Sequence, residues 1–149
     1  MKNRRVMRWS RRNDINQETI LDNIDCTQLA MDDQRFLYVS DCQMHEVRRY
    51  QMGDTQGTVV ASGNGQGNHL NQLYYPTYLF VDRDQSVYVS DTYNHRVMKW
   101  VKGATEGIVV AGGRGMGTDW TQLSSPNAII VDQLGRVYVA DLGNHRVVR

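Results

Sequence analysis

Short apolar runs alternate with clusters of turn residues along the chain, and no stretch keeps an apolar period of 3.6 residues. Val, Ile and Tyr dominate the runs, and these side chains favour strands, whereas Gly, Asn and Asp between them favour turns. In one stretch the pattern predicts four short strands, at residues 78–82, 86–91, 96–101 and 107–111. We expect no helix between residues 76 and 101. Without crossover helices, a parallel α/β fold is disfavoured.

The same pattern returns with a period of 50 residues. Residues 37–41, 87–91 and 137–141 each contain Tyr-Val followed by Ser or Ala and then Asp. Self-similarity at a period of roughly 20 to 50 residues is typical of solenoids, propellers and arrays. We therefore expect three aligned tyrosines to occupy equivalent positions when the units are superposed. These are Tyr38, Tyr88 and Tyr138.

Consecutive apolar positions within single strands indicate how these units pack. Residues 109–111 and 129–131 are apolar at every position, which suits a sheet that is covered on both faces. Four antiparallel strands per unit, covered on both faces by neighbouring units, describe the blade of a propeller. The predicted fold class is all-β, a partial β-propeller-type array of four-stranded antiparallel blades with about three to three and a half blades.

These units resemble the NHL repeat, which is named for an Asn-His-Leu stretch and occurs in β-propellers. The second unit carries Pro-Thr-Tyr-Leu-Phe-Val-Asp at 76–82, Val-Tyr-Val-Ser-Asp at 87–91 and Asn-His-Arg-Val at 94–97. The third unit agrees with it, whereas the first has Cys26 where Pro is expected and departs from Asn-His-Arg-Val at residues 44–47. The resemblance covers nearly the whole chain, and it implies a propeller of commonly about six blades.

The repeat makes the chain a single propeller segment of whole and partial units. Residues 1–22 form a partial blade, and the units that follow span about 23–72, 73–122 and, incompletely, 123–149. We predict 13 strands, grouped as two, four, four and three. Such a piece looks cut from a longer propeller and exposes uncapped end faces. We therefore expect a partner copy of the chain, further blades, or closure as a strained small ring to complete it.

Charge and composition narrow the range of partners. Six of the 17 basic residues lie within the first 12 positions, so the rest of the chain carries 11 basic and 16 acidic residues. A nucleic-acid binder usually spreads basic residues over its folded surface, and RNA binding is therefore disfavoured. No apolar run approaches the roughly 18 residues of a membrane helix. The basic N-terminus also lacks the apolar region of a secretory signal.

A set of Asp, His and Arg residues recurs after the second strand of each unit. Because His is a common zinc ligand, its histidines are one candidate metal site. Repeat-equivalent residues lie a blade apart, however, so we interpret the set as structural, with Asp accepting hydrogen bonds from turn backbone groups and from Arg. We predict no metal and no other cofactor. The set comprises Asp41, His45, Asp91, His95, Arg96, Asp141, His145 and Arg146.

Function is predicted from the loops that differ between units. They carry Tyr74, Tyr75, Tyr93 and Trp120, whose rings are of the type enriched at binding hot spots. We therefore predict a non-catalytic scaffold that binds a protein or peptide on its loops. The resemblance leaves two alternatives, a propeller that binds single-stranded RNA beside ubiquitin-ligase modules and a metal-dependent lyase-like or hydrolase-like propeller. The sequence shows no constellation of base, nucleophile and oxyanion donors for the second alternative.

The two cysteines flank the first hairpin of the degenerate unit. Its turn is centred near Gln34, and residues that pair across a hairpin have numbers with a constant sum, so Cys26 is expected directly opposite Cys42. Directly opposite Cα atoms lie about 4.5–5.5 Å apart, which permits a disulfide, although cross-strand disulfides are often strained. We expect the thiols close together and leave the disulfide open, because nothing in the sequence indicates an oxidising compartment.

Overall fold

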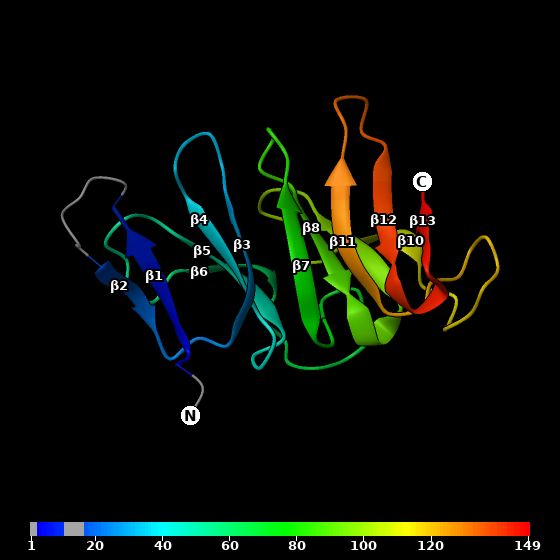
Figure 1. Ribbon diagram of the computed structural model, residues 1–149, viewed down its shortest axis with the longest axis horizontal. Coiled ribbons are helices and arrows are strands. Elements are labelled where there is room, and N and C mark those ends of the chain that lie inside the picture. Colours follow the sequence, from blue (N-terminus) through cyan, green and yellow to red (C-terminus); the bar gives the residue numbers. More distant parts are fainter. Residues whose placement is uncertain (1–2, 11–16) are drawn as a thin grey trace.

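The computed structural model describes residues 3–10 and 17–149, and its architecture is all-β (Figure 1). These residues form 13 strands and two short 3₁₀ turns. The first six strands are β1 (Arg5–Trp9), β2 (Gln17–Asp22), β3 (Cys26–Met31), β4 (Leu37–Asp41), β5 (Glu46–Tyr50) and β6 (Thr58–Ser62). The remaining elements are β7 (Pro76–Val81), β8 (Val87–Asp91), η1 (Thr92–Asn94), β9 (Arg96–Trp100), β10 (Ile108–Gly112), β11 (Pro126–Val131), β12 (Val137–Asp141), η2 (Leu142–Asn144) and β13 (Arg146–Val148).

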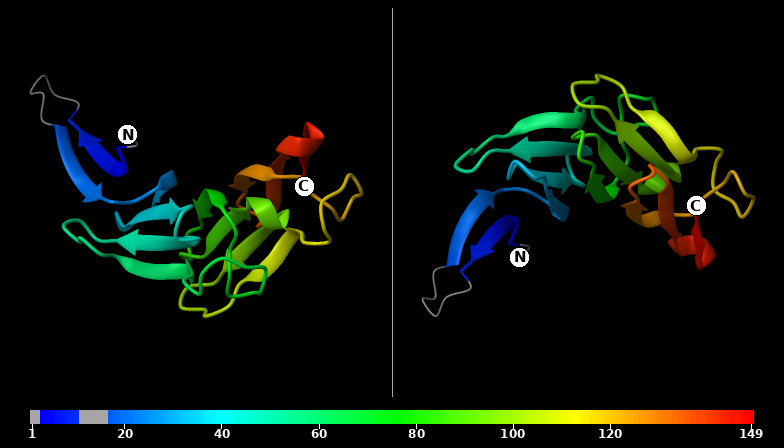
Figure 2. Two further views of the ribbon diagram at one scale, coloured as in Figure 1. Left: turned by 90° about the horizontal axis from the view of Figure 1, so that it is seen from below. Right: turned by 90° about the horizontal axis from the view of Figure 1, so that it is seen from above.

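The described strands group into antiparallel sheets of two, four, four and three strands, as the repeat predicts. In chain order the sheets are β1-β2, β3-β4-β5-β6, β7-β8-β9-β10 and β11-β12-β13. Figure 2 shows them side by side around an open arc, arranged like the blades of a propeller. Strand β7 contacts both β3 and β11, so the first strands of successive blades are neighbours.

Three basic residues of the N-terminus lie outside the residues that the structure describes. They are Lys2, Arg11 and Arg12. Within the described residues, no helix has the length and apolar character needed to cross a membrane.

The hydrophobic core lies between the sheets, with one cluster for each pair of neighbours. In β4, Tyr38 faces the cluster shared with the next blade, whereas Val39 faces the cluster shared with β1 and β2. Tyr88 and Val89 divide in the same way one blade further along the chain. Because successive side chains of a strand point to opposite faces, an unbroken apolar run fills two clusters at once. This arrangement confirms two covered faces for the two complete blades, whereas the run at 129–131 has one face open, because Ile130 is 63% exposed.

The three aligned tyrosines occupy equivalent positions in their blades. Tyr38, Tyr88 and Tyr138 each lie at the second position of the second strand and pair with the fifth residue of the first strand. This placement confirms the 50-residue register. The turn before each second strand begins at an equivalent aspartate, and the Oδ1 atom of Asp132 accepts two backbone N–H groups of that turn. A turn held by its own aspartate is an Asx-type turn.

The prediction of no helix between residues 76 and 101 is wrong over three residues. Thr92–Asn94 form the 3₁₀ turn η1, and Leu142–Asn144 form η2 at the equivalent place. Each turn ends at a histidine in the left-handed region, with φ of 52° at His95 and 51° at His145. A single 3₁₀ turn connects two adjacent antiparallel strands without a crossover, so the all-β architecture is unchanged.

A β-bulge displaces the two cysteines from their predicted pairing. The rest of the hairpin keeps the predicted register, but the register shifts between Cys26 and Gln28, so Cys26 pairs with Asp41 instead of Cys42. Both cysteines are free thiols. Burial raises the pKa of both thiols above the ordinary value, which keeps them protonated and weakly nucleophilic.

The same bulge recurs at the start of β7 and of β11. Pro76 pairs with Asp91, and Pro126 pairs with Asp141, with the register shifting immediately afterwards. The bulge adds one residue to the first strand of each blade. It therefore places the repeated aspartate beside the point where the chain enters the blade.

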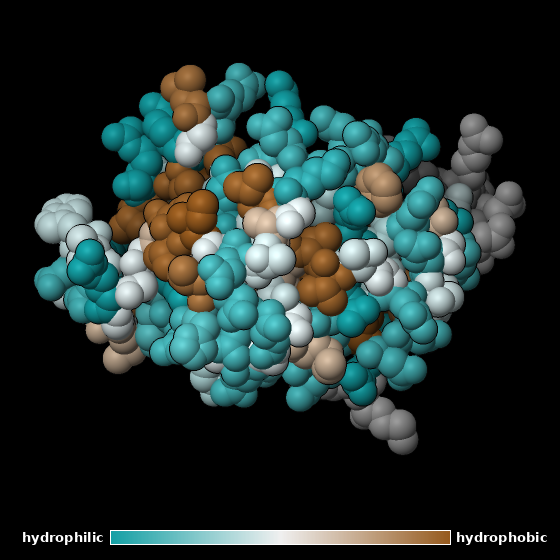
Figure 3. Space-filling view, turned by 180° about the vertical axis from the view of Figure 1, so that it is seen from behind, coloured by the Kyte–Doolittle hydropathy of each residue, from teal (hydrophilic) through white to brown (hydrophobic). Residues whose placement is uncertain are grey.

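Apolar side chains also reach the surface on the side opposite the view of Figure 1. Figure 3 shows them gathered toward the end of the molecule that carries the C-terminus. The exposed apolar residues of the outer strands include Ile108 and Val109 on β10 and Val147 on β13. Both β10 and β13 are edge strands of their sheets.

Candidate functional site

Two kinds of loop meet on one side of the molecule, which we call the loop face. Long linking segments carry the chain from one blade to the next, at residues 63–75 and 113–125. Short loops follow the second strand of each blade, at residues 42–45, 92–95 and 142–145, and they lie on the lower side of Figure 1. All the aromatic residues predicted as binding candidates lie in these loops.

A buried charged pair holds the first linking segment. The Asp91 carboxylate is fully buried, and it accepts the backbone N–H of Tyr74 at 2.6 Å and the Nε–H of Arg96 at 2.6 Å. Asn94 Nδ2 donates to the same carboxylate and to the carbonyl oxygen of Gly67, each at 2.8 Å. Arg96 also donates to the carbonyl oxygens of Asn68, His69 and Gln72. The backbone group that Asp91 accepts therefore belongs to the linking segment, and not to the turn between the second and third strands.

The third unit repeats these contacts, and the first does not. Asp141 accepts the N–H of Ser124 at 2.6 Å and pairs with Arg146 at 2.8 Å, and Arg146 donates to three carbonyl oxygens of residues 118–122. In the first unit Glu46 stands where Arg is expected and pairs with Arg48. Asp41 there accepts the N–H groups of Gln43 and Met44, in its own loop.

The two equivalent aspartates are expected to titrate differently. Burial raises the pKa of Asp91 above its usual value and outweighs the hydrogen bonds to it. For Asp141, the N–H of Ser124 together with Asn144 and Arg146 outweighs burial, so its pKa is lowered. We predict that carboxyl carbon NMR of the whole chain will show Asp91 binding a proton at a higher pH than Asp141, with Asp→Asn variants assigning the signals.

The direction of each pKa shift determines how the stability of the folded chain changes with pH. Asp141 contributes stability above its unfolded pKa, and that contribution is lost as the pH falls through its lowered folded pKa. Asp91 behaves oppositely, because a raised pKa means that ionisation costs the folded state free energy as the pH rises. An Asp141 signal that titrates at or above that of Asp91 would contradict this assignment.

The repeated histidines link neighbouring blades. His45 Nδ1 accepts the backbone N–H of Tyr75 at 3.1 Å, and His95 Nδ1 accepts that of Ser125 at 3.1 Å. Each bond joins the short loop of one blade to the residue just before the first strand of the next. A ring nitrogen that accepts a hydrogen bond is unprotonated. The imidazoles of His45 and His95 therefore have separate local partners, and His145 lies one blade further on.

Three of the four predicted aromatic residues come together on the loop face. The rings of Tyr75 and Tyr93 stack with centroids 4.8 Å apart and an interplanar angle of 11°. Tyr74 meets Tyr93 edge-on at 5.1 Å, and His45 lies edge-on to Tyr74 at 5.7 Å. Tyr75 is 37% exposed and Tyr93 is 49% exposed. The cluster therefore presents a stacked tyrosine pair to solvent on an anchored base.

A hollow of about 340 Å³ lies beside this cluster. Tyr75 forms one of its walls, and Cys42, Asp25 and the start of β1 form others. The Arg4 guanidinium pairs with Asp25 at 3.0 Å along its rim. Sequence reasoning did not find this hollow, because its walls come from the partial first unit and the degenerate one, where no repeated motif marks them.

Comparison with known protein families identifies a match to one part of the chain. Residues 123–149 match the family model of the NHL repeat. The chain carries an NHL repeat. It is the unit that holds Asp141, Asn144 and Arg146, so the NHL motif coincides with the buried contacts described above. None of the curated protein sequences compared with the chain matches it.

Solved structures share the fold at low sequence identity. An auxiliary nutrient-binding protein from Bacteroides thetaiotaomicron VPI-5482 matches with a TM-score of 0.72 and 14% identity, over 97% of this chain and 42% of its own. A gluconolactonase from Xanthomonas campestris matches with a TM-score of 0.72 and 19% identity, over 97% of this chain and 50% of its own. The NHL-repeat chain thus spans half or less of the length of each, and these likenesses concern the fold alone.

Trp120 lies apart from the tyrosine cluster. It stands in the second linking segment, at the position equivalent to Leu70, and its side chain is 96% exposed. No ring contact is found for it among the described residues. The described residues also contain no group of three or more His, Cys, Asp or Glu side chains placed to hold a metal ion. The absence of a metal stays a prediction.

Proposed function

We propose that this NHL-repeat propeller segment is a non-catalytic scaffold that binds a protein or peptide through the tyrosine cluster of its loop face. The observation that carries the proposal is the stacked pair of Tyr75 and Tyr93, exposed beside a hollow of about 340 Å³. Tyrosine supplies a large, rigid contact surface with a polar tip, and such residues are enriched at binding hot spots.

The way the cluster is anchored supports this role. Tyr74 and Tyr75 are held through their backbone N–H groups, by Asp91 and His45 respectively, so their rings remain available for contacts. Loops that a rigid scaffold positions carry binding functions disproportionately often. A partner that packs against such a preformed surface loses little free energy to ordering it.

The alternatives predict different ligands. An RNA-binding propeller needs a basic groove beside its stacking rings, and Arg4 beside Tyr75 is already paired with Asp25. An enzyme role has one fold-level association, because one of the structurally similar proteins is named a gluconolactonase. Completion of the propeller by a second copy or by further blades also stays a prediction.

We expect peptides selected against the whole chain from a random displayed library to bind at the tyrosine pair. Tyr75→Ala or Tyr93→Ala should weaken the selected peptide about 30-fold, because removal of a hot-spot ring costs about 2 kcal/mol. Trp120→Ala is the matched control, since it removes an exposed ring from the neighbouring linking segment, and it should leave the affinity within about twofold. Isothermal titration calorimetry measures the affinity of the selected peptide for the wild-type chain and for the three variants.

Three results would overturn the proposal. The first is a selected peptide whose affinity is indifferent to both tyrosine substitutions. The second is salt-dependent binding of single-stranded RNA that is stronger than binding of any selected peptide. The third is hydrolysis of gluconolactone above the rate of the buffer.

A further inference from the structure

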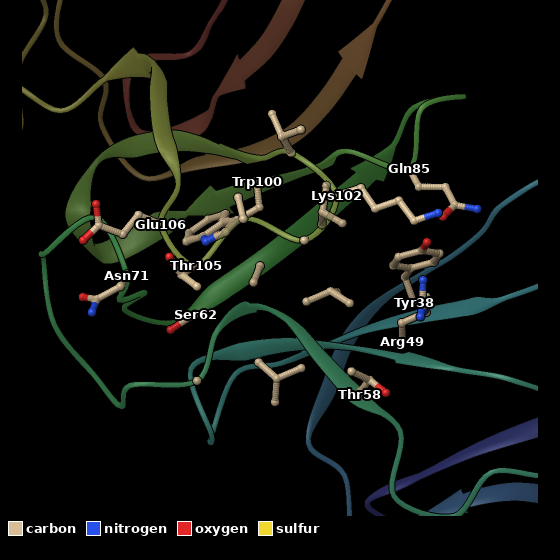
Figure 4. A pocket seen from close by; sticks show the side chains of 18 of the residues that line it. Tyr38, Arg49, Thr58, Ser62, Asn71, Gln85, Trp100, Lys102, Thr105 and Glu106 are labelled. Carbon is tan, nitrogen blue, oxygen red and sulfur yellow. The ribbon is translucent and has the colours of Figure 1, made fainter.

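A groove lies between the outer parts of the two complete blades (Figure 4), and none of the three tyrosines of the loop-face cluster lines it. Its volume is about 710 Å³. One wall is β6 with the side chains of Tyr38 and Arg49, and the other is Trp100 with the loop at residues 101–106 that follows β9. Val59, Val87 and Val101 give it an apolar lining.

Three residues that line this groove each carry one buried polar atom without a hydrogen-bond partner. The atoms are Ser62 Oγ, Gln85 Oε1 and Trp100 Nε1, and no other such atom is found among the described residues. Trp100 is 1% exposed and Gln85 is 8% exposed. Each unsatisfied buried polar group costs free energy, and groups of this kind indicate a missing water, ion or ligand. That all three line one groove indicates a polar occupant there.

The polar lining of this groove is not a property of the repeat. Positions equivalent to Gln85 hold Arg35 and Gly135, and the position equivalent to Ser62 holds Gly112. The corresponding grooves at the other two junctions have volumes of about 240 Å³ and about 670 Å³, so size alone does not distinguish this groove. Blade packing alone leaves a gap at every junction, but the chemistry of this gap is specific to it.

Charged side chains of opposite sign lie at the two ends of the groove. Figure 4 shows Lys102, Gln85, Tyr38 and Arg49 at one end and Glu106 at the other, with Trp100 and Ser62 on the side of Glu106. Lys102 and Glu106 are exposed, and neither is in an ion pair within the described residues. A complementary occupant is therefore long, apolar in its middle and oppositely charged at its two ends.

We propose that this groove binds a short extended peptide segment, with an acidic side chain at the end of Arg49 and Lys102 and a basic one at the end of Glu106. An extended main chain offers both C=O and N–H groups along its edge. A main-chain carbonyl oxygen is the kind of partner that the buried Trp100 indole N–H lacks, and a main-chain N–H is the kind that Gln85 Oε1 lacks. A purely apolar chain would leave both atoms unpaired, and a small anion would leave Glu106 without a partner. The site is independent of the tyrosine cluster of the loop face.

The test uses three mixtures of blocked pentapeptides on the ¹⁵N-labelled whole chain. The three central positions are randomised among Val, Thr and Ser, and the two ends are fixed as Asp and Lys, as Asp and Asp, or as Lys and Lys. The indole N–H signal of Trp100, assigned with Trp100→Phe, reports binding, and the signals of exposed Trp9 and Trp120 are internal controls. We expect the mixed-charge peptides to shift the Trp100 signal at concentrations at least about tenfold lower than either like-charged mixture.

Reversing one charge should change the preference. Glu106→Lys makes both ends of the groove positive, so the doubly acidic peptides should become the preferred ligands by about tenfold. Gln56→Lys is the matched control, because Gln56 occupies the equivalent position in the loop after β5 and lies outside the groove, and this variant should keep the wild-type preference. Both positions are exposed, so neither change removes a core contact.

Several outcomes would overturn the proposal. One is a Trp100 signal that none of the mixtures moves, which would mean that only water occupies the groove. Another is a preference that Glu106→Lys leaves unchanged or that Gln56→Lys changes equally. Binding that is lost in Tyr75→Ala would place the peptides on the loop face instead. Groove binding that persists in Tyr75→Ala separates this site from the proposed function.

Discussion

The Arg96→Ala protein is expected to lose about 3–5 kcal/mol of its free energy of unfolding. Arg96 is the partner of the fully buried Asp91 and donates to three carbonyl oxygens of the first linking segment. Its removal leaves a buried carboxylate with a weaker set of partners, and removing one member of a buried pair costs far more than the pair contributes. Urea unfolding followed by far-UV circular dichroism measures the loss.

Arg136→Ala is the matched control for this prediction. Arg136 pairs with Asp132 at 2.6 Å, the same distance as in the buried pair, but its side chain is 48% exposed. Exposed ion pairs contribute little because water screens them, so this variant should unfold close to the wild-type midpoint. Equal losses in the two variants would show that burial does not govern the strength of these contacts.

Trp100→Ala is expected to cost about 3–5 kcal/mol, the range found when a buried Phe or Trp is truncated. Trp100 is the largest fully buried side chain among the described residues, and it belongs to the cluster that joins the two complete blades. The substitution removes both its apolar area and the packing around Leu73 and Leu79, which share that cluster. Differential scanning calorimetry measures the change in unfolding temperature and enthalpy.

The repeat itself supplies the control for Trp100. Trp9 occupies the equivalent position in the partial first unit, yet it is 65% exposed. Trp9→Ala should therefore change the free energy of unfolding by no more than about 0.5 kcal/mol. If Trp9→Ala were as destabilising as Trp100→Ala, the cluster between the blades would not be the main source of stability.

Strand order and blade packing could be predicted from the sequence because both depend on features that recur. The 50-residue period identifies the strands, and runs of consecutive apolar positions indicate two covered faces, which holds for the two complete blades but not for 129–131, where Ile130 is exposed. The register near Cys26 could not be predicted in this way. A bulge adds one residue to a strand without a residue type that marks it, so a constant pairing sum fails at that point.

The same distinction applies to the candidate site, whose residues could be selected from the sequence although their arrangement could not be predicted. Tyr74, Tyr75 and Tyr93 could be selected from the sequence as aromatic residues in variable loops. Their stacking could not be predicted, because it depends on how two loops from different parts of the blade meet. The groove escaped sequence reasoning for another reason. Gln85 is one polar residue in a turn, and only its burial against the preceding blade distinguishes it from an ordinary turn residue.

The linking segments are anchored through their main chain and through Leu73 and Leu123, whose side chains are buried in the core clusters. Arg96 and Arg146 bind carbonyl oxygens, and Asp91 and Asp141 bind amide groups, which nearly every amino acid possesses. The exposed side chains between these anchors are therefore free to differ, as Leu70 differs from Trp120. Each segment is in effect an interchangeable cassette. New recognition properties can evolve, or be engineered, on this face by exchanging cassettes, at little expense to the folding of the blades beneath.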